Sequence, residues 1–189
     1  MRIISGDLKG RNILRTLNKS TRPLKDKVRE SIFNLLDHSK KICFKIEKSK
    51  ILDLYSGTGS FGLECLSRKA SHVTFIENGY EATKILKKNI EILKLQNKIK
   101  IFLKDVKNLD NIKKEFNNKF NLIFCDPPFK ENKINNILDI IYKNQIIEND
   151  GIIIIHRNKN TIESFDKHLN IIEERIYGLS RILFIKALP

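Results

Sequence analysis

The chain has 189 residues, and its 36 lysines and arginines against 22 aspartates and glutamates give a formal net charge of +14. This length suits one domain with a short appendage and leaves little room for a separate recognition domain. No apolar run approaches the roughly 18 residues of a membrane helix, no signal-peptide stretch opens the chain, and three scattered cysteines form no paired motif. We therefore expect a cytoplasmic protein with reduced thiols and no membrane association.

The first 50 residues predict a small basic unit. Residues 1–16 form two short extended runs around glycine-containing turns, which indicates a hairpin. Residues 26–36 place apolar side chains on one helical face, and residues 37–49 are polar and lysine-rich, as in a linker. This part has a net charge of +9, against +5 for the rest. The charge favours a nucleic-acid partner, although the heavy use of Ile, Lys and Asn is also typical of an AT-rich genome.

From residue 50 onward, short apolar runs alternate with amphipathic stretches. The runs predict strands at residues 51–55, 73–77, 99–103, 120–126, 151–156, 171–177 and 181–187. The stretches predict helices near residues 61–67, 80–95, 108–116 and 132–147. Such alternation is typical of a parallel, doubly wound α/β sheet.

The last two predicted strands are joined by only three residues, which suits an antiparallel hairpin and not a crossover helix. A seven-stranded, mostly parallel sheet that closes with such a hairpin is the Rossmann-like arrangement of class I methyltransferases. We therefore expect a basic, RNA-contacting hairpin and helix over residues 1–48, followed by a class I methyltransferase domain over residues 49–189.

A glycine-rich loop follows the first predicted strand of the sheet. Gly57, Gly59 and Gly62 satisfy the GxGxxG pattern of dinucleotide-binding loops, which alone is a weak signal. Glycines allow a tight turn and let a ligand approach bare backbone near a helix N-terminus. Asp53, at the end of the strand, would repel a pyrophosphate but tolerates an ammonium group. The loop therefore favours S-adenosylmethionine over a nicotinamide dinucleotide.

Two further carboxylates follow the next two predicted strands. Glu77 comes 24 residues after Asp53, where it can accept hydrogen bonds from both ribose hydroxyls. Asp105 follows the third strand, where it can accept a hydrogen bond from an adenine amine. Three acids at successive strand ends suit a cationic, hydroxyl-bearing adenosyl ligand. The predicted donor-binding residues are Asp53, Ser56, Gly57, Thr58, Gly59, Glu77, Asp105 and Val106.

The tetrapeptide Asp126–Pro127–Pro128–Phe129 follows the fourth predicted strand, at the edge where open α/β sheets bind ligands. Its prolines donate no N–H, which leaves the Pro127 carbonyl able to face a substrate. That carbonyl and Asp126 can accept both hydrogens of an exocyclic amine, which directs the nitrogen lone pair at a methyl group. Phe129 provides a flat face for an extruded base. We expect these four residues to form the catalytic site.

Several stretches of the chain form a familiar set. They are the opening RIISGDLKGR…TRPLKDKVRESIFNLL, the stretch ILDLYSGTGSFGLECLSRKA, the short motifs FIE and DPPF, and the closing YGLSRILFIK. Together they resemble, nearly end to end, the bacterial 16S rRNA (guanine-N2)-methyltransferase family. The resemblance implies S-adenosylmethionine as donor and a guanine exocyclic amine, in 16S rRNA or an assembling small ribosomal subunit, as acceptor. The chain departs from the family at Tyr55–Ser56, commonly Phe-Ala, and at Asn78–Gly79, commonly a Lys-Asp-like pair.

Basic residues near the N-terminus are the candidate RNA contacts. They are Lys9, Arg11, Arg15, Arg22, Lys25, Lys27 and Arg29. By the resemblance, the segment around Arg22 folds back near the donor and the acceptor. The four histidines show no metal-ligand spacing, so no metal is expected, and His156 could lie at the edge of the site. Cys125 lies inside an apolar run, where a buried core role is expected.

Three other functions fit parts of the sequence. DPPF alone also permits an adenine-N6 methyltransferase acting on DNA or RNA, which is the main alternative. The literal GxGxxG permits a nicotinamide-dependent oxidoreductase, but this leaves DPPF unexplained. A non-catalytic RNA-binding or assembly factor would not need both an intact donor loop and an intact acceptor motif. Nothing in the sequence suggests an obligate dimer, so a monomer is expected.

Overall fold

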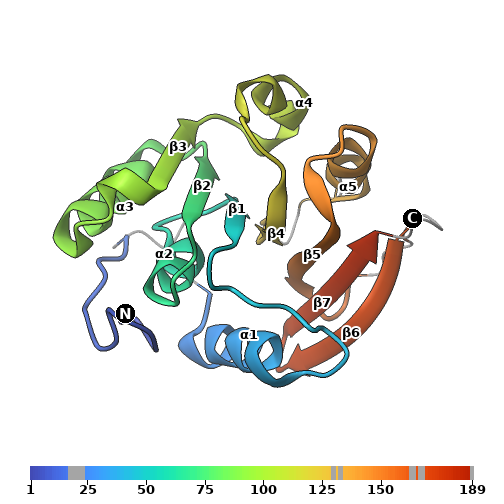
Figure 1. Cartoon of the computed structure of the whole chain (residues 1–189), viewed down its shortest axis with the longest axis horizontal. Coiled ribbons are helices and arrows are strands. Elements are labelled where there is room, and N and C mark those ends of the chain that lie inside the picture. Colours follow the sequence, from blue (N-terminus) through green and yellow to red (C-terminus); the bar gives the residue numbers. More distant parts are fainter. Residues whose placement is uncertain (17–23, 129–130, 132–133, 162–164, 166–168, 188–189) are drawn as a thin grey trace.

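A computed structural model describes residues 1–16, 24–128, 131, 134–161, 165 and 169–187. At its centre lies a seven-stranded sheet in the order β3-β2-β1-β4-β5-β7-β6 (Figure 1). The strands are β1 (Lys50–Leu54), β2 (His72–Glu77), β3 (Ile99–Leu103), β4 (Phe120–Cys125), β5 (Ile147–Asn158), β6 (Leu169–Tyr177) and β7 (Ser180–Ala187).

The first five strands pair in parallel, and β7 runs antiparallel to both β5 and β6. The expected mostly parallel sheet with a C-terminal antiparallel hairpin is therefore confirmed. The hairpin forms because only Gly178 and Leu179 separate β6 from β7, and Gly178 takes a positive φ of 61°.

Helices cover both faces of the sheet (Figure 1). On one face lie α1 (Asp26–His38), α2 (Ser60–Ser67) and α3 (Tyr80–Leu93). On the other lie α4 (Leu109–Ile112), between two short 3₁₀ turns, and α5 (Ile134–Lys143). Alternate strand residues point to opposite faces, and both faces are buried. This explains why the strands read as continuous apolar runs.

The N-terminal segment, residues 1–16, packs on the same face as α2 and α3. Its two extended runs meet at a single isolated bridge between Arg2 and Asn12, so the expected hairpin is short. The buried carboxylate of Glu64 on α2 accepts hydrogen bonds from the backbone N–H groups of Ile4 and Ser5, at 2.7 and 2.9 Å. The segment therefore shares a core and buried hydrogen bonds with the sheet domain.

Two expectations about the elements need correction. Residues 37–49 are more than a polar linker, because Ile42 and Ile46 are buried in the main core. The expected helix over residues 132–147 ends at Lys143, and β5 begins at Ile147 instead of residue 151. Gln145 takes a positive φ of 50°, which turns the chain, and the polar residues 148–150 hide the early start of the strand.

Candidate active site

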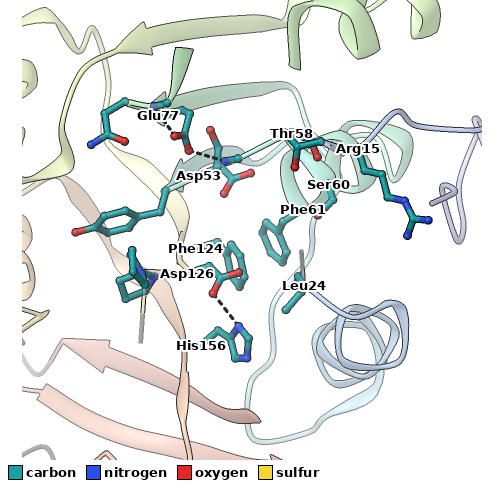
Figure 2. Close-up of a pocket in the computed structure, with 18 residues that line it drawn as sticks. Arg15, Leu24, Asp53, Thr58, Ser60, Phe61, Glu77, Phe124, Asp126 and His156 are labelled. Carbon is teal, nitrogen blue, oxygen red and sulfur yellow. Dashed lines mark hydrogen bonds and ion pairs between the residues drawn. The ribbon is translucent and has the colours of Figure 1, made fainter. Parts of the chain in front are cut away.

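A cavity of about 460 Å³ opens at the carboxyl ends of β1, β2, β4 and β5 (Figure 2). Its volume falls within the range of small-molecule sites, and its place at this edge is where open α/β sheets bind ligands. The cavity is lined by Arg15, Thr16, Leu24, Asp53, Tyr55, Ser56, Gly57, Thr58, Ser60, Phe61, Glu77, Asn78, Gly79, Phe124, Asp126, Pro127, Pro128 and His156.

The glycine loop between β1 and α2 forms one wall. Tyr55, Gly57 and Gly59 take positive φ values of 58°, 55° and 83° in a tight turn. A Cβ on Gly57 would meet no atom within 4 Å, whereas one on Gly59 would lie 2.3 Å from Leu86 Cδ1 on α3. Gly57 therefore leaves open space beside the cavity. Gly59 lets the loop pack closely on α3, and its predicted contact with the donor stays a prediction.

The acids that end β1 and β2 are held by backbone N–H groups. Asp53 is almost fully buried, and its Oδ2 accepts a hydrogen bond from the Gly62 N–H at 3.0 Å. Glu77 accepts from the N–H of Gly57 at 2.8 Å and from the N–H of Gly79 at 2.7 Å, one on each carboxylate oxygen. Because each oxygen has two lone pairs, both acids keep acceptor capacity toward the cavity.

Burial raises the pKa of the Asp53 carboxyl well above its ordinary value. The Gly62 N–H acts in the opposite direction, and the nearby charges of Asp126 and Glu77 raise the pKa further. Three carboxyl groups thus face one cavity with little solvent around the deepest of them. Such a site favours a ligand that brings a positive charge.

The opposite side of the cavity carries the acceptor motif (Figure 2). Asp126, Pro127 and Pro128 all line it, as expected. The Asp126 side chain is 20% exposed, and its Oδ1 lies 2.8 Å from Nδ1 of His156. The sequence placed His156 no nearer than the edge of the site, yet the structure makes it the direct partner of Asp126.

The pairing of Asp126 with His156 follows from the register of strands β4 and β5. Strands β4 and β5 are parallel, and their pairing ends at Cys125 opposite Ile155. The next residues are Asp126 and His156, which therefore lie side by side at the sheet edge. The missing information was the register, which no local pattern in the sequence reveals.

Two aromatic rings lie at the sheet beneath the cavity. Phe61 of α2 stacks on Phe124 of β4, with ring centroids 3.9 Å apart, and both line the cavity. Figure 2 shows Asp53 and Glu77 on one side of the pocket and Asp126 with His156 on the other. The arrangement offers an apolar surface between two polar ends.

The chain after the two prolines is fastened to the sheet. The N–H of Glu131 donates to the carbonyl of Pro128 at 2.8 Å. The wholly buried Arg157 of β5 donates from its guanidinium to the carbonyl of Glu131 at 2.7 Å. Lys107 also pairs with the Glu131 carboxylate at 3.3 Å. These contacts fix the position of Glu131, three residues after Pro128. Phe129 lies outside the described residues.

Not every predicted donor residue faces the cavity. Asp105 and Val106 are absent from the described residues that line it. The Asp105 side chain accepts a hydrogen bond from the Lys107 N–H at 2.9 Å and so caps a 3₁₀ turn, and Val106 is buried. Their predicted contact with the adenine stays a prediction.

Five of the seven candidate RNA contacts have exposed side chains. Lys9, Arg11, Arg15, Lys25 and Lys27 are exposed. Arg22 lies outside the described residues.

The prediction for Arg29 is wrong, because its side chain is wholly buried. Its guanidinium donates to the Arg2 carbonyl at 2.6 Å and to Asp26 at 3.1 Å. Burial also lowers the pKa of Arg29 from its ordinary value. Arg29 therefore fastens α1 to the N-terminal segment and is not available to a phosphate.

Within the described ranges, no three His, Cys, Asp or Glu side chains gather in a way that could hold a metal ion. Over the same ranges, no helix has the length and apolar character needed to cross a membrane.

The sheet order, the glycine loop after β1, the acid at the end of β2 and the prolines after β4 define a class I methyltransferase, which uses S-adenosylmethionine as methyl donor. The chain belongs to the family described as "Conserved hypothetical protein 95", whose sequence model matches residues 1–186.

Individual relatives agree with this assignment. The chain is 32% identical to the protein YlbH of Bacillus subtilis over 187 residues, which is 98% of each chain. It is 29% identical over 180 residues to "Ribosomal RNA small subunit methyltransferase D" of Haemophilus influenzae, covering 95% of this chain and 90% of that protein. The solved structure of the Escherichia coli protein yhhF matches with a TM-score of 0.84 and 25% identity, over 100% of this chain and 98% of the other.

Proposed function

We propose that the protein acts as a monomer that transfers a methyl group from S-adenosylmethionine to the exocyclic N2 amine of a guanine in 16S rRNA. The observation that carries the proposal is one cavity with Asp53 and Glu77 on one side and Asp126 on the other. The name of the Haemophilus influenzae relative supports small-subunit rRNA as the substrate. The sequence resemblance supports guanine N2 as the atom that is methylated.

The donor side has the chemistry that this ligand requires. When bound, S-adenosylmethionine supplies a methyl group on a positively charged sulfur. Asp53 would hold the ammonium of its methionine end, and Glu77 would accept hydrogen bonds from the ribose hydroxyls. Both carboxylates are already oriented by backbone N–H groups, so little reorganisation is needed.

On the acceptor side, Asp126 and the carbonyl of Pro127 would each accept one hydrogen of the amine. Accepting both hydrogens localises the nitrogen lone pair and turns it toward the methyl group. The nitrogen forms a bond to the methyl carbon while the bond from that carbon to the donor sulfur breaks and leaves a neutral thioether. The nitrogen then loses one proton, and the Asp126 carboxylate would lie beside it to receive that proton. Most of the rate enhancement comes from positioning.

We further propose that residues 1–48 form the RNA-contacting face. The exposed side chain of Arg15 lines the cavity, so this face continues into the site. The buried Asn89 of α3 accepts from the Leu14 N–H at 2.7 Å and donates to the carbonyls of Leu14 and Thr58, both at 3.1 Å. One side chain thus ties the N-terminal segment to the donor loop.

Neutralising Lys9, Arg11 and Arg15 together should weaken RNA binding about tenfold or more at moderate salt. A variant that makes fewer phosphate contacts releases fewer counterions when it binds, so its affinity should depend less steeply on salt concentration. Binding is measured by filter retention or fluorescence anisotropy across a salt series. The matched control replaces three lysines outside this face, Lys114, Lys119 and Lys143. An unchanged salt slope in the first variant would exclude this face as the RNA footprint.

The proposed reaction is tested by labelled-methyl transfer to small ribosomal particles from a strain that lacks the modification, followed by nucleoside mass spectrometry. We expect N2-methylguanosine at a single site. N6-methyladenosine would establish the alternative adenine activity instead. Donor binding without any transfer to the particles would overturn the proposed acceptor.

A further inference from the structure

Three side chains form a hydrogen-bond chain that begins at the cavity and ends inside the protein. Asp126 Oδ1 lies 2.8 Å from His156 Nδ1, and His156 Nε2 lies 2.9 Å from Ser180 Oγ. Side-chain exposure falls from 20% at Asp126 to 5% at His156, and Ser180 is 2% exposed overall. The hydrogen-bond chain therefore has one partly exposed end, at the proposed acceptor site, and one end buried in the protein interior.

The strand register builds this chain. Asp126 and His156 follow the last paired residues of the parallel strands β4 and β5. On the antiparallel side, His156 pairs with Ile182 of β7, and Ser180 lies two residues before it on the same face. The imidazole is thus held between two neighbouring strands and has little room to rotate.

The protons in the chain follow from what each group can donate. An ionised carboxylate only accepts, so Nδ1 of His156 carries the proton that is shared with Asp126. In the neutral ring Nε2 is then the acceptor, and the Ser180 hydroxyl donates to it. In the described part of the chain, Asp126 makes this contact through Oδ1 alone, which leaves Oδ2 for the cavity.

We propose that His156 and Ser180 are positioning residues that orient Asp126 toward the acceptor amine. The inference rests on the function proposed above, because it names the groups that prepare Asp126 for that reaction. The Asp126 carboxylate keeps the imidazole in the Nδ1–H form, Ser180 holds the ring through Nε2, and the imidazole holds Oδ1, so that Oδ2 faces the amine nitrogen. The Nδ1–H dipole also stabilises the carboxylate in its accepting form.

The same three residue types occur in the catalytic triads of hydrolases, but the exposure is reversed here. A nucleophilic serine must face the substrate, whereas Ser180 is buried and absent from the described residues that line the cavity. The aspartate is instead the group that lines it. The arrangement therefore presents a carboxylate to the substrate and not a nucleophilic hydroxyl.

The first test reads the histidine tautomer by ¹⁵N-correlated NMR of the full chain without substrate, across a pH series that identifies the neutral ring. The signal of His156 among the four histidines is assigned by its loss in His156→Asn. We expect the Nδ1–H form, whereas imidazole in water prefers Nε2–H. Asp126→Ala should release the ring toward Nε2–H. Ser180→Ala should keep Nδ1–H, because the carboxylate still accepts from it, but should lower kcat, which Ser180→Thr should restore. Finding Nε2–H in the unmodified protein would overturn the proposal, whatever its activity.

The second test compares two uncharged replacements of His156. The asparagine amide can donate from near the position of Nδ1, whereas the glutamine amide reaches the position of Nε2. We expect kcat to fall less than about fivefold in His156→Asn and about 30-fold in His156→Gln, with the KM for S-adenosylmethionine unchanged in both. A purely structural role predicts losses that follow thermal stability instead. Equal kcat in the two variants would overturn the proposal.

These readouts separate failure of the inference from failure of the proposed function. An unmodified protein with the Nδ1–H tautomer but no methyl transfer to small ribosomal particles would exclude the proposed reaction and leave the hydrogen-bond chain in place. Transfer to guanine together with the Nε2–H tautomer would exclude the positioning role alone.

Discussion

The two sides of the cavity hold their carboxylates in different ways. On the donor side, Asp53 and Glu77 receive backbone N–H groups from Gly62, Gly57 and Gly79, which lie nine, 20 and two residues away in sequence. On the acceptor side, Asp126 is held by a side chain 30 residues away, which in turn contacts Ser180 on a third strand. The donor side thus depends on the path of the main chain, and the acceptor side on individual side chains.

Asp126→Ala tests the acceptor side most severely. Removing the carboxylate takes away an acceptor for the amine and the group next to the departing proton. We expect methyl transfer to fall by about 1,000-fold or more, with donor affinity changed less than about threefold. Single-turnover transfer and calorimetric titration of S-adenosylmethionine measure the two quantities. Asp139→Ala, an acid on α5 away from the cavity, is the control. Equal activity in Asp126→Ala and unmodified protein would rule out the proposed amine site.

Gly59→Ala tests the donor side through the main chain. The residue has a φ of 83°, and an added Cβ would lie 2.3 Å from the wholly buried Leu86. Backbone strain and overpacking together should cost about 3 kcal/mol of stability and distort the loop, lowering donor affinity about 50-fold. Gly10→Ala is a matched control, because its φ is 82° with no atom within 4 Å and it lies outside the cavity lining. Similar donor affinity in both variants would contradict the role of close packing.

Glu77→Gln tests a donor-side carboxylate while keeping its size. Glutamine has one acceptor oxygen, so it cannot accept from both Gly57 and Gly79 as the carboxylate does at 2.8 and 2.7 Å. We expect donor affinity to fall about tenfold, the value of roughly one charge-assisted hydrogen bond. Calorimetry measures this, with Glu81→Gln on the exposed side of α3 as the control. Full affinity in Glu77→Gln would mean that the ribose contacts do not need this carboxylate.

The smallest expected effect is on pH dependence. Because burial raises the pKa of Asp53, the free protein keeps that proton above the ordinary aspartate range. An ammonium ligand pairs with the ionised form, so binding releases a proton and affinity rises with pH, at most about tenfold per pH unit. By the same linkage, the stability of the free protein falls as pH rises from the ordinary aspartate pKa through the raised one. Calorimetry in buffers of different ionisation heat detects the proton, and Asp53→Asn should abolish its release. Release of a proton by Asp53→Asn would assign the effect to another group.

Much of the fold could be predicted because both sheet faces are buried. Strands buried on both faces are continuous apolar runs, and a three-residue link between two of them excludes a crossover helix. Prediction from local patterns failed where polar or charged residues lie inside a strand or on the buried face of a helix. Residues 148–150 are polar although β5 runs through them, and Arg29 is charged although its place on the apolar face of α1 buries it.

The order of the strands along the chain, the glycine turn and the acids near the strand ends could all be predicted from local sequence patterns. These depend on local backbone preferences and on continuous apolar runs in strands buried on both faces, which neighbouring residues express directly. Three contacts follow from the packed fold alone: His156 with Asp126, His156 with Ser180, and Asn89 with both the N-terminal segment and the donor loop. Such contacts join residues 24 to 75 positions apart, and they depend on strand register and helix placement, which the whole packed core sets.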